Sequence, residues 1–154
     1  MKYLYILIFL LSQCYMQARL SFDNKFSYDI QDISSGISIS YDKVLVKQLN
    51  VNFGIGLEHM LPRDIGNSKF DANNIYLFLR YVYEKKWSSY LRLGYNRING
   101  IDRKGRNGLL CAFGVDYKLT DKWHIEMGYH ILSTNEEYAS RILGSISRYF
   151  KKKD

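Results

Sequence analysis

Apolar and polar side chains alternate along most of the chain, and the pattern is clearest between Asn50 and Leu61. The odd-numbered positions of this stretch carry Val51, Phe53, Ile55, Leu57, His59 and Leu61. The even-numbered positions carry Asn52, Gly54, Gly56, Glu58 and Met60. Because successive side chains of a strand point to opposite faces, the stretch predicts a β-strand with one apolar and one small or charged face.

The same alternation recurs in segments of about ten residues, the length that a tilted membrane-spanning strand needs. The segments predicted as strands are 20–30, 36–46, 50–61, 74–83, 87–97, 108–119, 123–132 and 139–150. No stretch shows sustained helical periodicity, so the predicted fold class is all-β. The last segment places Arg148 on its apolar face, where an Arg near a strand end can reach the membrane interface.

The predicted connections alternate in length. Short connections fall at 47–49, 84–86 and 120–122, and longer ones at 31–35, 62–73, 98–107 and 133–138. Short periplasmic turns and longer extracellular loops are typical of antiparallel up-and-down membrane barrels. With eight strands, both chain ends are expected on the short-turn side.

The glycines and the aromatic residues indicate which face points outward. The polar faces hold Gly54, Gly56, Gly94, Gly114 and Gly128, as expected where side chains fill a narrow eight-stranded lumen. Aromatic residues gather at strand ends, as in a membrane-interface girdle: Tyr81, Tyr83, Trp87, Tyr117, Trp123, Tyr149 and Phe150. We therefore predict a transmembrane barrel with a filled polar lumen. A secreted, lipocalin-like soluble barrel that binds an apolar ligand is the alternative, because its strands also alternate.

The first residues resemble a secretory signal peptide. Lys2 is followed by the apolar run Tyr3–Leu11 and a small residue at Ala18, a pattern too short for a membrane-spanning helix. We predict a leader over 1–18 and a barrel domain over 19–154, with lipidation at Cys14 as the alternative to cleavage after Ala18. Cleavage would leave Cys111 as the one thiol, and so no intrachain disulfide and no cysteine-based metal site.

The net charge of the chain does not identify a binding partner. The 154 residues form one domain by length, with 22 Lys and Arg against 15 Asp and Glu, a net charge of +7. The basic residues are scattered, many of them at predicted turns, whereas a nucleic-acid surface needs them concentrated on one face. We expect no nucleic-acid partner.

Several charged residues fall on the predicted lumen face. They are Glu58, Arg80, Arg92, Asp116 and Glu126, together with Lys118 and His130. Charges removed from bulk water must be paired, so we expect Arg80 and Arg92 to meet Glu58 and Glu126 in a structural plug. A proton path or a small gated pore is the functional alternative, and eight strands leave little room for an open channel.

A basic segment lies in the predicted connection 98–107. Arg103, Lys104 and Arg106 are predicted to contact lipopolysaccharide phosphates or another acidic partner, or else to form a solvated loop tip. The chain shows no phosphate-binding glycine loop and no metal-ligand spacing, so no metal or cofactor is expected.

A lipid A-modifying enzyme is the other alternative. His130, Ser133, Glu136 and Glu137 lie near one strand end, but a regular strand points His130 and Ser133 to opposite faces. A nucleophile needs its base within hydrogen-bond reach. We therefore predict no catalytic residues and a protein that is not an enzyme.

Two segments carry a resemblance to a known superfamily. Gly144-Ser-Ile-Ser-Arg-Tyr-Phe150 and Gly114-Val-Asp-Tyr-Lys-Leu-Thr-Asp-Lys-Trp123, with the leader and the eight short strands, resemble the small OmpA/OmpX-like outer-membrane barrels of Gram-negative bacteria. One difference is that Lys151–Asp154 follow Phe150, where the family usually ends. The resemblance implies an outer-membrane location and a structural or surface-interaction role rather than that of a general porin. It further implies contact with lipopolysaccharide and phospholipid, insertion by the barrel-assembly machinery, and a monomer.

Overall fold

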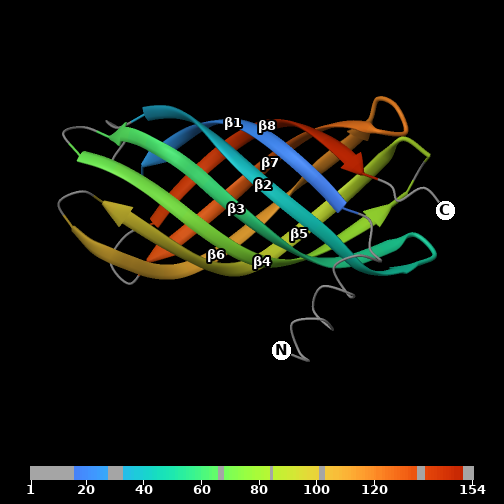
Figure 1. Cartoon of the computed structure of the whole chain (residues 1–154), viewed down its shortest axis with the longest axis horizontal. Helices are drawn as coiled ribbons and strands as arrows, with labels where there is room; N and C mark the ends of the chain where they lie inside the picture. Colours follow the sequence, from blue (N-terminus) through green and yellow to red (C-terminus); the bar gives the residue numbers. More distant parts are fainter. Residues whose placement is uncertain are drawn as a thin grey trace, which may run out of the picture.

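The strands form a closed barrel (Figure 1). The computed structural model describes residues 16–27, 33–65, 68–83, 85–100, 103–134 and 138–150. In these residues the strands are β1 (Met16–Ser27), β2 (Ile33–Gln48), β3 (Val51–Ile65), β4 (Ser68–Val82), β5 (Trp87–Gly100), β6 (Arg103–Lys118), β7 (Trp123–Thr134) and β8 (Tyr138–Phe150). Each strand pairs antiparallel with the next and β8 pairs with β1, which confirms the predicted eight-stranded up-and-down barrel.

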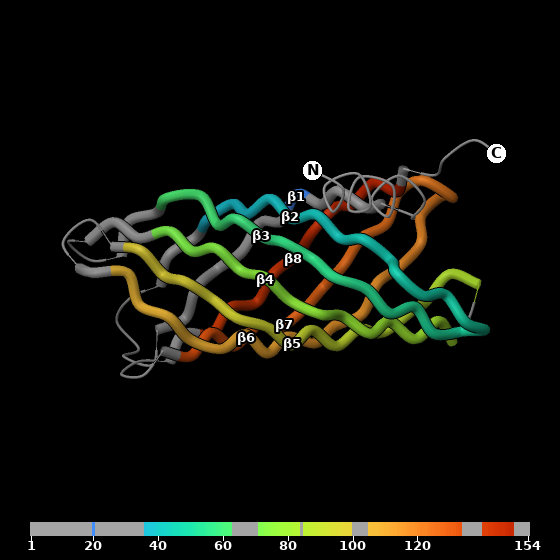
Figure 2. Tube along the Cα trace, turned by 60° about the horizontal axis from the view of Figure 1, so that its bottom comes forward, coloured from blue at the N-terminus to red at the C-terminus, as the bar shows by residue number. Residues whose placement is uncertain are grey.

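One end of the barrel carries the turns β2–β3, β4–β5 and β6–β7, and we call it the short-turn end (Figure 2). Met16 of β1 pairs with Phe150 of β8, so the first and last described residues also lie there. Leu49 in the β2–β3 turn has φ of 49°, an uncommon conformation for a branched residue. No helix among the described residues is long and apolar enough to cross a membrane.

The strands extend further at the opposite end than the sequence predicts. They are 12–16 residues long, which exceeds the roughly 9–11 residues needed to cross a bilayer. Most of the predicted connection 62–73 belongs to β3 and β4, and most of 98–107 belongs to β5 and β6. The prediction of two long loops is therefore wrong at these positions.

The extension has a visible physical cause. Beyond the apolar segments the outward-facing side chains become polar: His59, Asn73, Arg97 and Asn107 are exposed and follow one another across paired strands. Because the outward positions are no longer apolar, the alternation that marks a strand disappears, although the hydrogen-bonded ladder continues.

The outward face is apolar and the inward face is polar. Phe53, Leu93 and Ile125 expose 37%, 53% and 41% of their surface, whereas Glu58 and Arg92 expose 5% and 1%. The outward apolar side chains form a belt, which comprises Phe53, Leu57, Ile75, Leu77, Leu79, Leu91, Leu93, Leu109, Phe113, Val115, Ile125, Met127, Ile142 and Ile146. A belt of this size on the outside of a closed barrel matches hydrocarbon, not water, and contradicts the lipocalin-like alternative.

The strand β2 departs from regular alternation. Val44 pairs with Gly54 but Val46 pairs with Phe53, so Leu45 is an extra residue in a β-bulge. Val44 accordingly faces inward and Val46 outward, with exposures of 9% and 53%. The bulge changes the face on which the last residues of β2 lie.

The strand β1 begins inside the predicted leader. Met16, Gln17 and Ala18 pair with residues of both β2 and β8, whereas the segment predicted from the sequence starts at Leu20. The site of the expected cleavage after Ala18 therefore lies within β1. Residues 1–15 and the predicted strand end at 28–30 lie outside the described residues.

Candidate functional site

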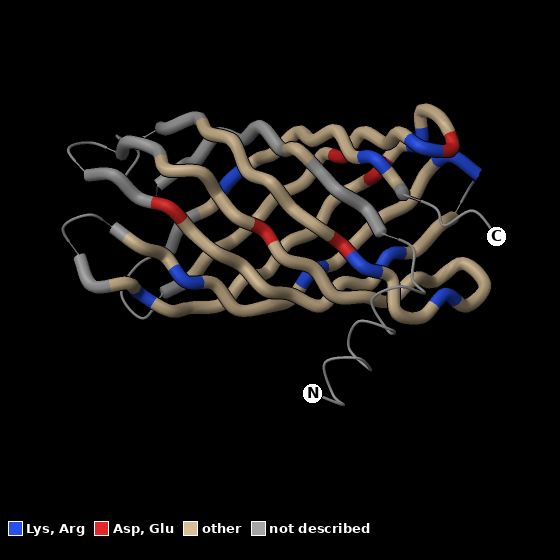
Figure 3. Tube along the Cα trace, viewed as in Figure 1, with Lys and Arg blue, Asp and Glu red and all other residues tan. Residues whose placement is uncertain are grey.

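The lumen holds all five residues assigned to a charged network from the sequence. Glu58 lies on β3, Arg80 on β4, Arg92 on β5, Asp116 on β6 and Glu126 on β7, and none exposes more than 5% of its surface. Figure 3 shows such charges distributed along the barrel wall rather than gathered at one level. Ionised groups buried this deeply must be paired and hydrogen-bonded.

The middle of the lumen is organised around Arg92. Its Nη2 lies 2.8 Å from Glu126 Oε2 and 3.8 Å from Asp42 Oδ2. Arg80 Nη2 lies 4.0 Å from the same oxygen of Asp42, and the Tyr76 hydroxyl donates to Asp42 Oδ1 at 2.6 Å. Of the pairs expected from the sequence, Arg92 with Glu126 is therefore present, whereas Arg80 lies beside Asp42.

A second group surrounds Glu58. Arg141 Nη2 donates to Glu58 Oε2 at 2.5 Å, and Asn74 Nδ2 donates to the same oxygen at 2.8 Å. The Ser38 hydroxyl donates to Glu58 Oε1 at 3.0 Å. Arg141 was not among the residues selected from the sequence, although it shares the odd-numbered face of β8 with Leu143, which is also buried.

His130 joins the two groups. Arg141 Nη2 donates to His130 Nδ1 at 2.8 Å, and Arg92 Nη1 lies 3.4 Å from His130 Nε2. Contacts therefore run from Glu58 on β3 through β8, β7 and β5 to Asp42 on β2. This cross-lumen network links strands that are not neighbours in the sheet.

The network is balanced in charge. Among the described residues it contains three buried arginines, Arg80, Arg92 and Arg141, and three buried carboxylates, Asp42, Glu58 and Glu126. The lumen therefore requires no counter-ion at these positions, which is what a structural plug needs.

A third group lies nearer the short-turn end. Asp116 Oδ2 accepts a hydrogen bond from Ser88 at 3.2 Å and lies 2.9 Å from His124 Nδ1. Ser88 and His124 thus both contact Asp116. In a nucleophilic triad the histidine instead lies between the serine and the aspartate. The arrangement holds a carboxylate in place and activates no hydroxyl.

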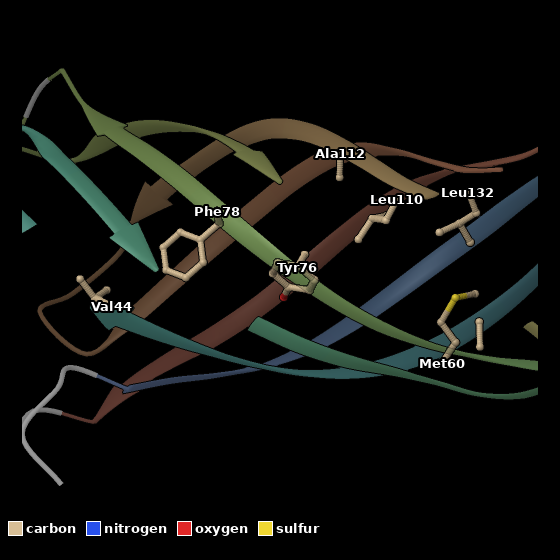
Figure 4. Close-up of a cluster of buried hydrophobic side chains, with 8 residues drawn as sticks. Val44, Met60, Tyr76, Phe78, Leu110, Ala112 and Leu132 are labelled. Atoms are coloured by element: carbon tan, nitrogen blue, oxygen red, sulfur yellow. The ribbon is translucent and has the colours of Figure 1, made fainter. Parts of the chain in front are cut away.

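Apolar side chains also fill the lumen, and the prediction of a charged network did not include them. Met60, Ala72, Leu110 and Leu132 form a layer near the end opposite the short turns, and each exposes 2% of its surface or less. Figure 4 shows Met60, Leu110 and Leu132 close together, with Phe78 further along the barrel. We call Met60, Ala72, Leu110 and Leu132 the apolar layer. Their even-numbered positions place them on the lumen face, so the signal was present in the sequence.

Glycines make room for the aromatic rings. A methyl group at Gly56 would overlap the ring of Tyr76 and approach Asp42 Oδ1, and one at Gly128 would overlap the hydroxyl of Tyr90. These close approaches explain why small residues alternate with large ones on the lumen face.

The basic residues assigned to a surface loop belong to a strand. Arg103, Lys104 and Arg106 lie in β6, so the predicted loop position is wrong. Arg106 is partly buried and pairs with Ile98 of β5. The side chains of Arg103 and Lys104 lie outside the described residues.

The candidate catalytic residues do not meet. His130 is 1% exposed inside the lumen, and Ser133, three positions further along β7, belongs to the opposite face. Glu136 and Glu137 lie outside the described residues. Among the described residues, no group of three or more His, Cys, Asp or Glu side chains could hold a metal ion.

The fold is shared with solved bacterial proteins of very different sequence. It resembles Ail, the attachment invasion locus protein of Yersinia pestis, with 8% identity, a TM-score of 0.64, and coverage of 89% of this chain and 97% of that one. It resembles OprG from Pseudomonas aeruginosa with 12% identity, a TM-score of 0.65, and coverage of 90% and 97%. Neisserial surface protein A matches with 18% identity, a TM-score of 0.59, and coverage of 89% and 97%. No family model matches the chain, and no curated protein sequence matches it.

Fold and surface together define the class. The chain has the fold of the small outer-membrane β-barrels of Gram-negative bacteria, and its apolar belt faces outward as a lipid-embedded barrel requires. Its location is accordingly the outer membrane.

Proposed function

We propose that this protein is a closed, non-conducting outer-membrane barrel with a structural or surface-interaction role. The observation that supports this most directly is the cross-lumen network, which joins β3, β8, β7, β5 and β2 through buried contacts. The apolar layer lies beyond it, toward the end opposite the short turns. Hydrated ions would have to break paired charges and cross an apolar constriction, so a general porin activity is not expected.

Conductance across a planar bilayer tests the closed lumen. Purified protein inserted into the bilayer should give no stable open current, because both the network and the apolar layer are intact. The variant Glu126→Ala with Glu58→Ala, checked for folding by its heat-dependent gel mobility, provides the comparison for a weakened plug. Stable porin-sized currents from the unaltered protein would contradict the proposal.

The surface role is assigned to the end opposite the short turns. There the strands continue beyond the belt and present His59, Asn73, Arg97 and Asn107 outward. The His59 ring and the Asn73 amide are held together at 2.8 Å, so part of this surface is ordered. We assign lipopolysaccharide headgroups as its contacts. Ail carries an attachment role in its name, and surface contact by this chain would be of the same general kind.

Binding of purified lipopolysaccharide tests this assignment. Arg97→Glu should weaken binding by the barrel in detergent, because Arg97 is exposed at the extended end. Gln48→Glu, at an exposed position of the short-turn end, serves as the control and should bind normally. Equal binding by all three proteins would refute the assignment.

A lipid A-modifying activity has less support. His130 Nδ1 is already occupied by Arg141, and no serine is placed to use this ring as a base among the described residues. Lipid A mass spectra from cells with His130→Gln should match those from cells with the unaltered protein. A change in acylation that depends on His130 would establish an enzyme instead.

Export and assembly follow the usual route of such barrels in this proposal. Residues 1–18 act as the leader, and the aromatic end of β8 is the signal read by the barrel-assembly machinery. Cleavage after Ala18 would leave Arg19 as the first residue of β1, still paired with Ser40 and Ser147. N-terminal sequencing of the membrane protein tests the cut. The closed sheet leaves no strand edge for a second copy, which supports a monomer.

A further inference from the structure

The short-turn end is strongly basic. In the described part of the chain its side chains include Lys47, Lys85, Lys86, Lys118, Lys122 and Arg148, against the single exposed acid Asp121. Lys118 Nζ lies 2.6 Å from Asp121 Oδ1. The basic residues come from the β2–β3, β4–β5 and β6–β7 connections and from the end of β8, and therefore surround the barrel (Figure 3). We call these six residues the basic rim.

An aromatic girdle lies directly beside the basic rim. It comprises the outward residues Tyr81, Tyr83, Trp87, Tyr117 and Trp123. The rings of Trp87 and Tyr117 are in contact, with centroids 4.6 Å apart, and the Arg148 guanidinium lies 5.6 Å from the centre of the Trp123 ring. Amphipathic rings of this kind sit at the headgroup level of a bilayer. The girdle therefore fixes the height of the lipid headgroups relative to the basic rim.

The position of the basic rim beside the aromatic girdle determines which part of the lipid it contacts. Acyl chains must cover the belt, so the headgroups of those same lipids lie at the girdle and just beyond it. Lys85, Lys86 and Lys122 are exposed at that height on long, flexible side chains. Positive side chains next to a bilayer surface attract anionic lipids over about a Debye length.

The opposite end has a different character. Its described outward side chains are mostly neutral: His59, Asn73, Asn99 and Asn107 surround the single cation Arg97 and the acid Asp71, and Asn99 donates to Asp71 at 2.8 Å. The exposed lysines of the described surface, which are Lys47, Lys85, Lys86 and Lys122, all lie at the short-turn end. In an outer-membrane barrel that end faces the phospholipid leaflet.

We propose that the basic rim binds the phosphates of anionic phospholipids in the leaflet at the short-turn end. The proposal rests on the proposed function only in that the barrel must span a bilayer. Occupied headgroup sites would stabilise the folded barrel, because the unfolded chain does not present the six charges in one ring.

Thermal unfolding in vesicles of defined composition tests the rim. Unaltered protein is folded into phosphatidylcholine vesicles and into phosphatidylcholine vesicles that contain phosphatidylglycerol, and the temperature of its heat-dependent gel shift is compared. We expect a higher transition temperature with phosphatidylglycerol, and a loss of the difference at high salt. A transition temperature that is the same in both lipids would overturn the proposal.

Two variants localise the effect. Lys85→Gln, Lys86→Gln and Lys122→Gln combined should keep the transition temperature seen in phosphatidylcholine but lose the shift with phosphatidylglycerol. Arg97→Gln, at an exposed position of the opposite end, should retain the shift. A triple variant that still shifts fully would place the lipid contact elsewhere and refute the rim.

A further arm separates lipid from free anion. Inorganic phosphate added to protein in phosphatidylcholine vesicles should not reproduce the shift, and a shift with phosphate alone would overturn binding to lipid. Failure to fold in either kind of vesicle would count against the membrane barrel itself. Folding in both kinds without any lipid dependence would count against the rim alone.

Discussion

On β5, Leu91 faces outward and exposes 43% of its surface, whereas its neighbour Arg92 faces inward and exposes 1%. Leu91 contacts the hydrocarbon of the bilayer, where any apolar side chain is stabilised whatever its orientation. Arg92 meets Glu126, Asp42 and His130, each at a particular position on another strand. Two adjacent positions of one strand therefore differ in what they require: the outward position needs only an apolar side chain, and the inward position needs particular partners.

The difference shows where this fold keeps its specificity. Outward positions need only an apolar side chain of suitable bulk, because lipid adapts to the surface. Inward positions need a particular partner, because nothing else in the lumen can replace a lost charge or hydrogen bond. Substitutions on the two faces should therefore differ in how much unfolding free energy they cost. They should also differ in whether a second substitution can restore the lost stability.

The largest effect is expected from breaking the pair of Glu58 and Arg141. Glu58→Leu removes the carboxylate partner from an arginine buried in the lumen, and we expect a loss of about 3–5 kcal/mol in the free energy of unfolding. Denaturant unfolding in lipid vesicles, followed by tryptophan fluorescence, measures the change.

A double variant identifies the cause. Glu58→Leu combined with Arg141→Leu removes both charges, so it should recover a substantial part of the stability lost by Glu58→Leu alone. Additive losses would instead show that the two side chains contribute independently of their contact at 2.5 Å.

The next largest effect is expected on the outward face. Leu91→Arg places a charge in the middle of the belt of β5 and should cost about 2–4 kcal/mol. Tyr95→Arg lies nearer the end of the belt on the same strand, where the cost falls to about 0–1 kcal/mol. Equal costs at the two positions, measured by unfolding in vesicles, would show that depth in the bilayer does not govern this face.

Glycines on the two faces provide a smaller and closely matched comparison. Gly56→Ala should destabilise by about 1–3 kcal/mol, because the new methyl group overlaps the Tyr76 ring within the lumen. Gly144→Ala on β8 is the control, because nothing lies within 4 Å of the added carbon and the position is exposed. It should be neutral or slightly stabilising, since alanine restricts the unfolded chain. A neutral Gly56→Ala would show that Tyr76 moves aside freely.

The overall fold follows from a local signal. Alternation in the stretch 50–61 and its counterparts is enough to predict eight strands and the outward direction of Phe53 and Leu93, because the period of two is a property of each strand alone. The extended ends of β3 and β5 could not be predicted in this way. There the outward side chains are no longer apolar, so the alternation is lost, and the ladder continues through partners on neighbouring strands.

The pairing inside the lumen is a long-range property. Glu58 and Arg141 are 83 positions apart, and their contact depends on how β3 and β8 are staggered around the barrel. Parity alone places Arg141 and Asp42 on the lumen face, so both could have been selected as candidates from the sequence. The partners of these two residues could not be predicted, because the alternation of side chains does not show which of several opposite charges at a similar depth each residue meets.

The smallest effect is expected where a charge pair lies in water. Lys118 and Asp121 form an ion pair at 2.6 Å in the β6–β7 turn, but the Asp121 side chain is 93% exposed. Asp121→Asn should therefore change the free energy of unfolding by about 0–1 kcal/mol, because water solvates either partner once the pair is broken. Comparison with Glu58→Leu under the same conditions separates burial from ion pairing as the source of stability. A loss at Asp121 as large as that at Glu58 would mean that pairing alone, regardless of depth in the barrel, sets the stability.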